Sequence, residues 1–545
     1  MKKPQILILI LFLLVTGVNA FGKAVSIEQA ENYLDQMAEK GHFSGSVLLA
    51  RNGKVLLNKG YGLANIETGT PNTPQTRFRL ASITKQFTGL AILILQERGK
   101  LKTDDPICKF VENCPAAWQT ITLRHLVSHT SGIKDFTSLP DSEKKKSENI
   151  SPLQIIDWFK DKPLDFKPGE RFSYSNSGYI LLGYVIEKLS GQSYKDFIAE
   201  NIFQPAGMKN SGYDSHAEII KNRASGYSLH GENVVNADYV DMQVPFAAGA
   251  LYSTTEDLYL WHKALGSEKL LSHKSLEEMF TPIKDGYGFG IVMESRNGID
   301  FQTHSGGIQG FSTNFARFPK EDAVVIVLSN RDFAPTDFIK TQMMKFIFDD
   351  KFELPEFIEM PEGGLKNFEG LYQTNENVPF QRLYVEDKKI WLTFPGGLPM
   401  PFSPVSETKF ISRYDSDISL EFEKDPEAKI RSATINAPGF QQKLNRAEIK
   451  PPALEGNFTF RLKGFEKATV VNLAGTFNNW KPTATFCGKE NDGWVCRLDL
   501  TPGKYLYKFI VDGRWIVDPA NPLKEDDGNG NTNSVVQIFP TKTDQ

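Results

Sequence analysis

Residues 78–87 read Phe-Arg-Leu-Ala-Ser-Ile-Thr-Lys-Gln-Phe, so a serine and a lysine stand three positions apart where an apolar run begins. The run continues through Leu95 and ends at Gly99, which predicts a buried helix with a glycine cap at its C-terminus. Because positions i and i+3 share a helix face, the Lys85 amine is expected beside the Ser82 hydroxyl. A helix N-terminus and a desolvated lysine both favour loss of the serine proton. Ser82 is therefore a candidate nucleophile for attack on carbonyl groups.

The Ser-x-x-Lys spacing alone is a weak signal, because it occurs four times in the chain. Ser131 precedes a glycine turn, Ser142 lies in a run of charged residues, and Ser406 lies in a strand-rich segment. Only Ser82 opens an apolar helix, which sets it apart from the other three.

Two further polar clusters follow along the chain. Tyr174 is the only one of 17 tyrosines followed two positions later by asparagine, here Asn176, just before a helix predicted over 178–189. His304 begins the only His-x-Gly among eight histidines and leads to Gly307. Each cluster alone fits a helix-entry aromatic or a glycine turn equally well. The order Ser-x-x-Lys, Tyr-x-Asn, His-x-Gly is far harder to attribute to chance.

Together these motifs resemble the penicillin-recognising serine hydrolases, in the branch of class C β-lactamases, D-aminopeptidases, D,D-peptidases and related esterases. The resemblance spans residues 25 to 345 and is supported by the stretches 122–132 and 249–257. It implies an α+β domain over 21–350, with a helical subdomain against an antiparallel sheet. The expected strands are 46–50, 55–57, 288–293, 313–318 and 323–328, and the expected helices are 26–40, 82–98, 123–128, 152–161 and 178–189.

The resemblance also implies roles for the site residues. Ser82 would form an acyl-enzyme, with Lys85 and Tyr174 moving its proton to the leaving group. The backbone N–H groups of Ser82 and Gly307 would form the oxyanion hole, where one donor is typically worth about 3 kcal/mol of barrier. Asn176 would bind the substrate amide and help place Lys85. No metal or cofactor is expected.

His304 stands where relatives that bind a substrate carboxylate carry lysine. Histidine has an ordinary pKa of about 6.5 and is mostly neutral at pH 7, so that carboxylate loses its anchor. We therefore expect an esterase or D-amino-acid peptidase, with a β-lactamase or D,D-carboxypeptidase as the alternative. His304 could hydrogen-bond Tyr174 or a substrate oxygen, or be a turn histidine that does not contact substrate. A non-catalytic protein that binds glycans or wall peptides is a further alternative, and it would require an inert Ser82.

The N-terminus has the composition of a secretory signal peptide over residues 1–20. Lys2 and Lys3 precede an apolar run over 6–15, and Val-Asn-Ala at 18–20 fits a cleavage site. The sequence thus predicts export to the periplasm or the extracellular space, with an uncleaved anchor as the alternative. The formal net charge of −4 and the absence of a basic cluster argue against a nucleic-acid partner.

The four cysteines form two local pairs, and an oxidising compartment would allow each pair to close. Cys487 and Cys496 flank a hairpin turn at 491–493, which favours a disulfide across two strands. Cys108 and Cys114 leave bridged and free states equally open. Neither pair has the Cys-x-x-Cys spacing of a zinc site.

Beyond Asp350, prolines at 355 and 361 and the glycine pair at 363–364 predict a linker. Short alternating strands then predict a small β-barrel over 362–450. The stretch 369–372 and the pair 391–392 resemble the lipocalin-like domain often joined to these hydrolases. Such a barrel could shape the active-site entrance or serve only in packing.

Residues 452–545 predict a β-sandwich. The stretches 475–480 and 502–515 resemble the glycogen-binding module of the AMP-activated kinase β subunit and of branching enzymes. Indole rings stack on pyranose rings while lysine and asparagine hydrogen-bond hydroxyls, so an α-glucan or another polysaccharide is a candidate partner. A module that only packs is the alternative. The resemblance implies sugar contacts at Trp480, Lys508, Trp515 and Asn533.

Overall fold

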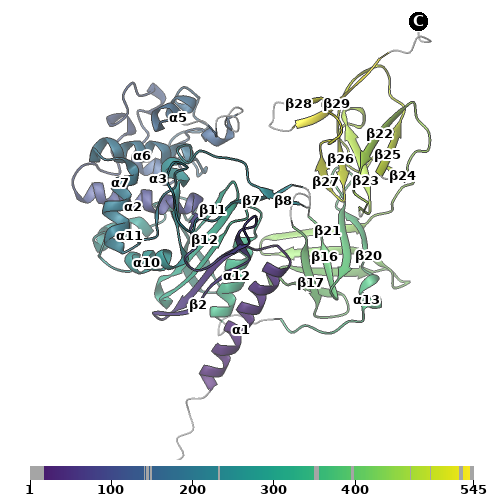
Figure 1. The fold of residues 1–545 in the computed structure, drawn as a ribbon, viewed down its shortest axis with the longest axis horizontal. Coiled ribbons are helices and arrows are strands. Elements are labelled where there is room, and N and C mark those ends of the chain that lie inside the picture. The colour runs from purple at the N-terminus through teal and green to yellow at the C-terminus, as the bar shows by residue number, and fades with distance from the viewer. Residues whose placement is uncertain are drawn as a thin grey trace, which may run out of the picture.

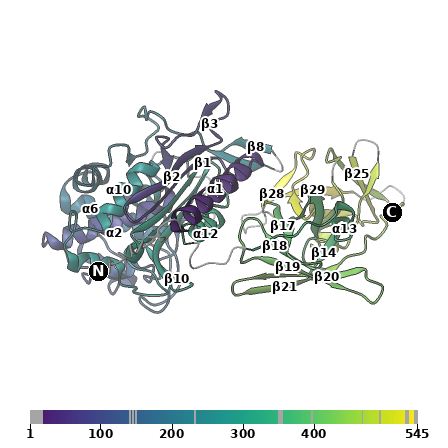
Figure 2. The ribbon, with the colours of Figure 1, turned by 90° about the horizontal axis from the view of Figure 1, so that it is seen from below.

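The computed structural model describes residues 18–139, 142, 146–147, 150–230, 233–348, 355–394, 398–466, 468–490, 493–526 and 532–539. The predicted signal peptide lies outside these ranges except for its last three residues, which begin helix α1 (Val18–Glu39). Three units follow one another along the chain: a mixed helix and sheet unit, a closed barrel and a pair of sheets (Figures 1 and 2). Within the described ranges, no helix combines the length and the apolar character needed to cross a bilayer.

The first unit is built on a six-stranded antiparallel sheet, with strand order β10-β11-β12-β13-β1-β2. Side chains of β13 alternate between two hydrophobic clusters, so both faces of the sheet are buried. The strands are β1 Gly45–Arg51, β2 Lys54–Tyr61, β10 Val292–Arg296, β11 Ile299–Ile308, β12 Phe311–Phe318 and β13 Ala323–Ser329.

Helices cover both faces of this sheet, which confirms the predicted α+β class. Helix α1 packs with α12 (Thr336–Ile347) on one face, and α10 (Thr255–Leu265) contacts the sheet from the other (Figure 1). Beyond α10 lies a helical subdomain around the buried α2 (Thr84–Glu97). Its other helices are α3 Leu123–Val127, α5 Pro152–Phe159, α6 Asn176–Ser190, α7 Tyr194–Ile198, α8 Gln204–Ala206, α9 Phe246–Gly249 and α11 His273–Phe280.

The strand predicted over 288–293 is wrong over residues 288–291, since β10 begins only at Val292. Gly290 has a φ of +75°, and a Cβ on it would lie 2.2 Å from the Lys85 carbonyl oxygen. Only glycine allows this turn to pack against the first turn of α2. The glycines therefore mark a close approach of two backbones and not a strand.

Small pieces of sheet connect these layers. Strand β9 lies between β5 and β6, β3 pairs with β4, and β7 pairs with β8. The bounds are β3 Leu63–Asn65, β4 Thr70–Pro71, β5 Phe78–Arg79, β6 Gly212–Tyr213, β7 Tyr227–His230, β8 Asn233–Asn236 and β9 Leu251–Ser253.

The second unit is a closed barrel of eight strands, which confirms the predicted small β-barrel. The glycine pair predicted in the linker lies instead within helix α13 (Glu362–Lys366). Pairing of Tyr372 with Arg446 closes the barrel, and Phe368, Phe410 and Phe422 pack together in its buried cluster. Its strands are β14 Gly370–Gln373, β15 Gln381–Glu386, β16 Lys389–Leu392, β17 Met400–Pro404, β18 Lys409–Ser412, β19 Ser419–Lys424, β20 Ile430–Ala437 and β21 Phe440–Arg446.

The third unit packs a three-stranded sheet, β22-β25-β24, against a five-stranded sheet formed by β23, β26, β27, β28 and β29. This arrangement is the predicted sandwich. The strands are β22 Phe458–Lys463, β23 Val471–Gly475, β24 Gly488–Glu490, β25 Gly493–Leu498, β26 Gly503–Val511, β27 Arg514–Ile516, β28 Lys524–Asp526 and β29 Thr532–Ile538.

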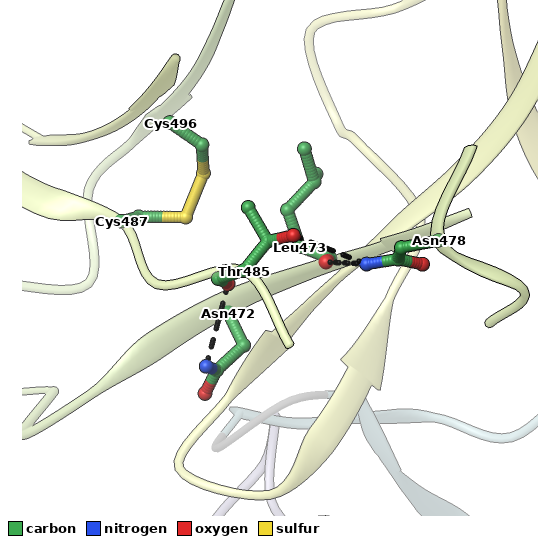
Figure 3. The surroundings of a disulfide bond; sticks show 6 residues. All are labelled: Asn472, Leu473, Asn478, Thr485, Cys487 and Cys496. Carbon is green, nitrogen blue, oxygen red and sulfur yellow. Dashed lines mark hydrogen bonds between the residues drawn. A yellow bond between two sulfur atoms is a disulfide. The ribbon is translucent and has the colours of Figure 1, made fainter. Parts of the chain in front are cut away.

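Both cysteine pairs form disulfides. The bridge between Cys487 and Cys496 joins β25 to the residue before β24, as expected, although turn residues 491–492 lie outside the described ranges. Figure 3 shows the surroundings of this disulfide, including Asn478, whose Nδ2 donates to the Leu473 carbonyl at 2.9 Å and to Thr485 Oγ1 at 3.1 Å. These bonds fix the loop that leads to Trp480.

The barrel contacts both neighbouring units. The Nζ atom of Lys345 in α12 donates to the Asp415 and Asp417 carboxylates in the loop between β18 and β19, at 2.8 Å each. On the sandwich side, Phe380 packs against Phe486, with ring centroids 5.8 Å apart. The three units are thus joined by buried side chains as well as by the chain itself.

Candidate active site

Ser82 lies in a single 3-10 turn, Ala81–Ile83, that runs directly into α2. Ala81 has a φ of +48°, in the left-handed region that non-glycine residues seldom occupy. Such a conformation costs about 1 kcal/mol or more and is typical of functional sites. This turn places Ser82 at the start of the helix, where its side chain stays partly accessible.

The Lys85 side chain is fully buried, and its Nζ atom has three oxygen neighbours. They are Ser82 Oγ at 3.0 Å, Asn176 Oδ1 at 2.9 Å and the Ala248 carbonyl at 2.8 Å. Burial lowers the pKa of Lys85 to about 7, while the nearby Asp135 carboxylate acts in the opposite direction. In the neutral amine two hydrogens bond Asn176 and Ala248, and the lone pair is left for Ser82.

The Tyr174 hydroxyl donates to Ser82 Oγ at 2.8 Å. The residue as a whole is 37% exposed, whereas its hydroxyl is buried beside Ser82. That burial raises the pKa of Tyr174, and the bond to Ser82 acts against the rise. Ser82 Oγ therefore lies between one amine and one phenol, both within hydrogen-bond distance.

Asn176 owes its orientation to Asp135, a residue that the motif analysis missed. The Asp135 carboxylate accepts from the Asn176 backbone N at 3.1 Å and from its side-chain Nδ2 at 3.2 Å. These two bonds turn the amide oxygen of Asn176 toward Lys85. Asp135 lies just beyond the stretch 122–132 that supported the family resemblance, and only its type and that proximity could have suggested it.

Glycines in β11 allow this strand to lie close to the turn that carries Ser82. A Cβ on Gly306 would lie 2.3 Å from the Leu80 carbonyl oxygen and 3.1 Å from the Ser82 nitrogen, so only glycine fits there. A Cβ on Gly307 would meet nothing within 4 Å, so this residue borders open space. The strand thus approaches the backbone N of Ser82 on the side where an oxyanion hole is expected.

His304 lies in β11 and is buried, so it is not a turn histidine. Its Nδ1 is 2.5 Å from the Ser305 carbonyl oxygen and its Nε2 is 2.8 Å from the Tyr287 hydroxyl. Because a carbonyl oxygen only accepts, Nδ1 carries the hydrogen and Nε2 accepts from Tyr287. Burial lowers the pKa of His304 to about 4. The ring is therefore neutral, and its hydrogen-bond partner is Tyr287 instead of Tyr174.

Two aromatic residues complete the wall of the site and were missed by the sequence reasoning. His129 lies 4.3 Å from Tyr174 and 4.6 Å from Tyr287, measured between ring centroids. Its Nδ1 accepts from the Ser175 backbone N at 3.1 Å, which fixes the segment that carries Tyr174. The position of His129 within the stretch 122–132 and the glycines after Tyr287 were the available signals in the sequence.

The four sugar-contact candidates gather on one sheet face of the sandwich. Lys508 in β26 and Trp515 in β27 lie on the face opposite the buried cluster, and Asn533 in β29 lies beside Lys508. Trp480 adds a second indole, 6.2 Å from that of Trp515. Trp515 is 41% exposed, whereas Asn533 is buried. Two neighbouring indoles with a lysine form a surface suited to stacking on sugar rings.

Among the described residues, no cluster of His, Cys, Asp and Glu has the composition of a metal site.

Comparisons with known proteins give family matches for two parts of the chain. Residues 30–344 match the Beta-lactamase family, and residues 458–544 match the family described as the glycogen recognition site of AMP-activated protein kinase. Penicillin-binding protein 4* of Bacillus subtilis (strain 168) is 30% identical over 425 residues, which cover 72% of this chain and 92% of that protein.

Solved structures show the same fold. The octameric penicillin-binding protein homologue from Pyrococcus abyssi is 27% identical to this chain and has a TM-score of 0.57. The match covers 77% of this chain and 99% of that chain. The D-amino acid amidase from Ochrobactrum anthropi SV3 is 24% identical with a TM-score of 0.54, over 60% of this chain and 99% of that chain. Because the family model matches residues 30–344, more than half of the chain, the chain belongs to the beta-lactamase family.

Proposed function

We propose that the protein is an exported serine hydrolase that cleaves ester or amide bonds through an acyl-enzyme on Ser82. The observation that carries the proposal is the position of Ser82 Oγ, 3.0 Å from Lys85 Nζ and 2.8 Å from the Tyr174 hydroxyl. Export rests on the signal-like composition of residues 1–20.

In the acylation step, neutral Lys85 takes the Ser82 proton while Oγ bonds to the carbonyl carbon. Backbone N–H groups of Ser82 and Gly307 would stabilise the oxyanion. As the bond between the carbonyl carbon and the leaving atom breaks, Tyr174 gives that atom a proton and is reprotonated from Lys85. Water then attacks the acyl-enzyme, loses a proton to the same pair of residues, and releases the acid as Ser82 regains its hydrogen.

The neutral ring of His304 bears on the substrate class. A buried imidazole whose two nitrogens are occupied by Ser305 and Tyr287 offers no positive charge to a carboxylate on the leaving group. Substrates with an uncharged leaving group, such as simple esters, amides and D-amino-acid amides, fit this end of the site better than penicillins or D-Ala-D-Ala peptides. The esterase or D-amino-acid peptidase activity is therefore proposed ahead of β-lactamase activity.

The proposal can be tested by trapping the acyl-enzyme. The mature protein is mixed with a short-chain p-nitrophenyl ester, quenched in acid and analysed by mass spectrometry. We expect a mass increase of one acyl group on the peptide that contains residues 78–87. A chromogenic cephalosporin and the anilides of D- and L-alanine, run in parallel, rank the substrate classes. An adduct on another residue, or none with any of the substrates, would favour the non-catalytic binding alternative.

The pH dependence follows from Lys85, whose pKa burial lowers to about 7. Only neutral Lys85 can accept the serine proton, so kcat/KM should fall about tenfold per pH unit below that pKa and level off above it. His304, with a pKa of about 4, should add no step between about pH 5 and 9. Initial rates across this range, with circular dichroism as the control for folding, check the prediction. A profile that falls as pH rises through 7 would contradict the role of Lys85.

Glucan binding is proposed for the C-terminal module, on the basis of the adjacent indoles of Trp480 and Trp515. Replacing Trp515 by alanine should weaken binding of a maltooligosaccharide by about 10- to 100-fold, because stacking on one exposed ring is lost. Isothermal titration of the full chain measures the change. Phe440, a more exposed aromatic on the barrel, is the control, and F440A should bind as the unmodified protein does. Equal affinity of W515A would argue for a packing role.

A further inference from the structure

A cavity of about 410 Å³ opens beside the strand that carries Gly307. Gln309 and Phe311, where β11 turns into β12, form one wall, and residues 236–240, at and after the end of β8, form another. Gln309 follows Gly307 by two residues, which is at most about 7 Å of chain. His304 lies three residues away on the other side of Gly307. The cavity and His304 therefore flank the proposed oxyanion hole from opposite ends.

The position of Tyr174 indicates which part of a substrate would reach this cavity. The Tyr174 and His304 rings lie 6.4 Å apart, so the proton donor for the leaving group is on the His304 side of Ser82. The leaving group must then lie toward His304. The acyl chain extends the other way along β11, toward Gln309.

Two arginines line the cavity and share one carboxylate. Arg79 Nε and Arg223 Nη1 each donate to the Asp214 carboxylate at 2.6 Å. Asp214 is fully buried, and the side chains of Arg79 and Arg223 are 10% and 27% exposed. One carboxylate balances only one of two guanidinium charges, so this cluster retains a positive charge in a region of low solvent access.

Donors remain on both arginines. Arg223 also donates to the Ser215 carbonyl at 3.2 Å, and Arg79 Nη2 lies 3.2 Å from His216 Nε2. Within the described ranges, Arg79 Nη1 and Arg223 Nη2 have no protein acceptor. Both atoms stay accessible, so a ligand can reach them. A planar carboxylate matches such paired guanidinium donors.

The rest of the lining defines the ligand further. Asp238 also borders the cavity, but its side chain is 81% exposed and lies 3.4 Å from Lys146 Nζ, so it offsets the arginines only weakly. Ile220, Val240 and Phe311 supply apolar walls. The cavity thus suits a short apolar chain that ends in a carboxylate.

We propose that Arg79 and Arg223 bind a carboxylate at the far end of the acyl group, so that the enzyme prefers acidic acyl chains joined to uncharged leaving groups. The inference rests on the proposed function. The proposed charge preference is the opposite of that in relatives that bind a carboxylate on the leaving-group side. The acidic acyl chain is a substrate feature that the three motifs alone do not indicate.

The test compares two esters that differ only in charge, the mono-p-nitrophenyl ester of adipic acid and its terminal carboxamide. For the full chain we expect kcat/KM for the acid to exceed that for the amide by about tenfold, the usual value of a charge-assisted hydrogen bond. In Arg223→Gln this ratio should fall toward one. Lys221→Gln removes the same charge two residues away, from an exposed side chain outside the cavity lining, and should keep the ratio.

A ratio near one in the unmodified protein, or an unchanged ratio in R223Q, would overturn the proposal. If R223Q loses activity on both esters because it misfolds, the salt dependence of the ratio in the unmodified protein is the test instead. The ratio in the unmodified protein should fall between about 0.02 and 0.5 M NaCl if a charge contact sets it, and a constant ratio refutes the contact. Ester hydrolysis that does not depend on Ser82 refutes the hydrolase proposal itself, whatever the ratio.

Discussion

Replacing Ser82 by alanine is expected to lower kcat for ester hydrolysis by at least about 10⁴-fold. The Oγ atom is the acceptor for the Tyr174 hydroxyl and the neighbour of Lys85 Nζ, so both proton-transfer groups converge on the atom that the substitution removes. No covalent intermediate can then form, and only ground-state binding and the backbone donors would remain. Initial-rate assays with a p-nitrophenyl ester measure the loss of kcat.

The chain supplies a matched control for this variant. Ser406 is also followed three residues later by a lysine, but its Oγ only accepts from the backbone N of Thr408 and Lys409 in an exposed turn. Ser406→Ala should leave kcat unchanged. Equal rates from S82A and the unmodified protein would remove Ser82 as the nucleophile and bring forward the binding-protein alternative.

Replacing Lys345 by methionine is expected to lower the free energy of unfolding by about 3–5 kcal/mol, the usual result of removing one partner of a buried ion pair. The Lys345 side chain is 1% exposed, and its Nζ donates to Asp415, Ser416 and Asp417 at 2.8 Å each. The Asp415 side chain, 8% exposed, would be left buried without its main cation. Arg296 contacts Asp417 and can compensate only in part.

Urea unfolding followed by tryptophan fluorescence measures this loss. Lys340→Met is the control, because Lys340 lies on the same helix but pairs with Asp337, whose side chain is 66% exposed. That variant should change stability by less than about 1 kcal/mol. The double variant K345M/D415L should regain much of the loss, since removing both charges avoids an unpaired carboxylate. If K345M is as stable as K340M, the barrel is not held by this pair.

Local patterns predicted a large share of the site. The i, i+3 spacing of Ser82 and Lys85 on an apolar helix fixes their proximity without help from the rest of the fold, because helix geometry alone sets it. The strands expected over 46–50 and 55–57 likewise pair as β1 and β2, since the turn between them is determined by adjacent residues. Tyr174 and Asn176 were found by their order relative to the other motifs.

Predictions failed where a residue type had two uses. Glycines at 288 and 290 resemble a glycine-containing strand, yet Gly290 serves the close approach to the Lys85 carbonyl. The glycine pair at 363–364 resembles a linker but lies in α13, where contacts with the barrel override weak helix propensity.

The sequence by itself determined the fold class, the three units and the proximity of Ser82 to Lys85, because these depend on periodicity and on spacings within one or two turns. Tertiary structure alone decided the partners of His304, the orientation of Asn176 and the pairing of Lys345 with Asp415. It also decided the convergence of Arg79 and Arg223 on Asp214. Each of these contacts joins residues far apart in the chain, and short-range patterns carry no information about which distant polar groups are buried together.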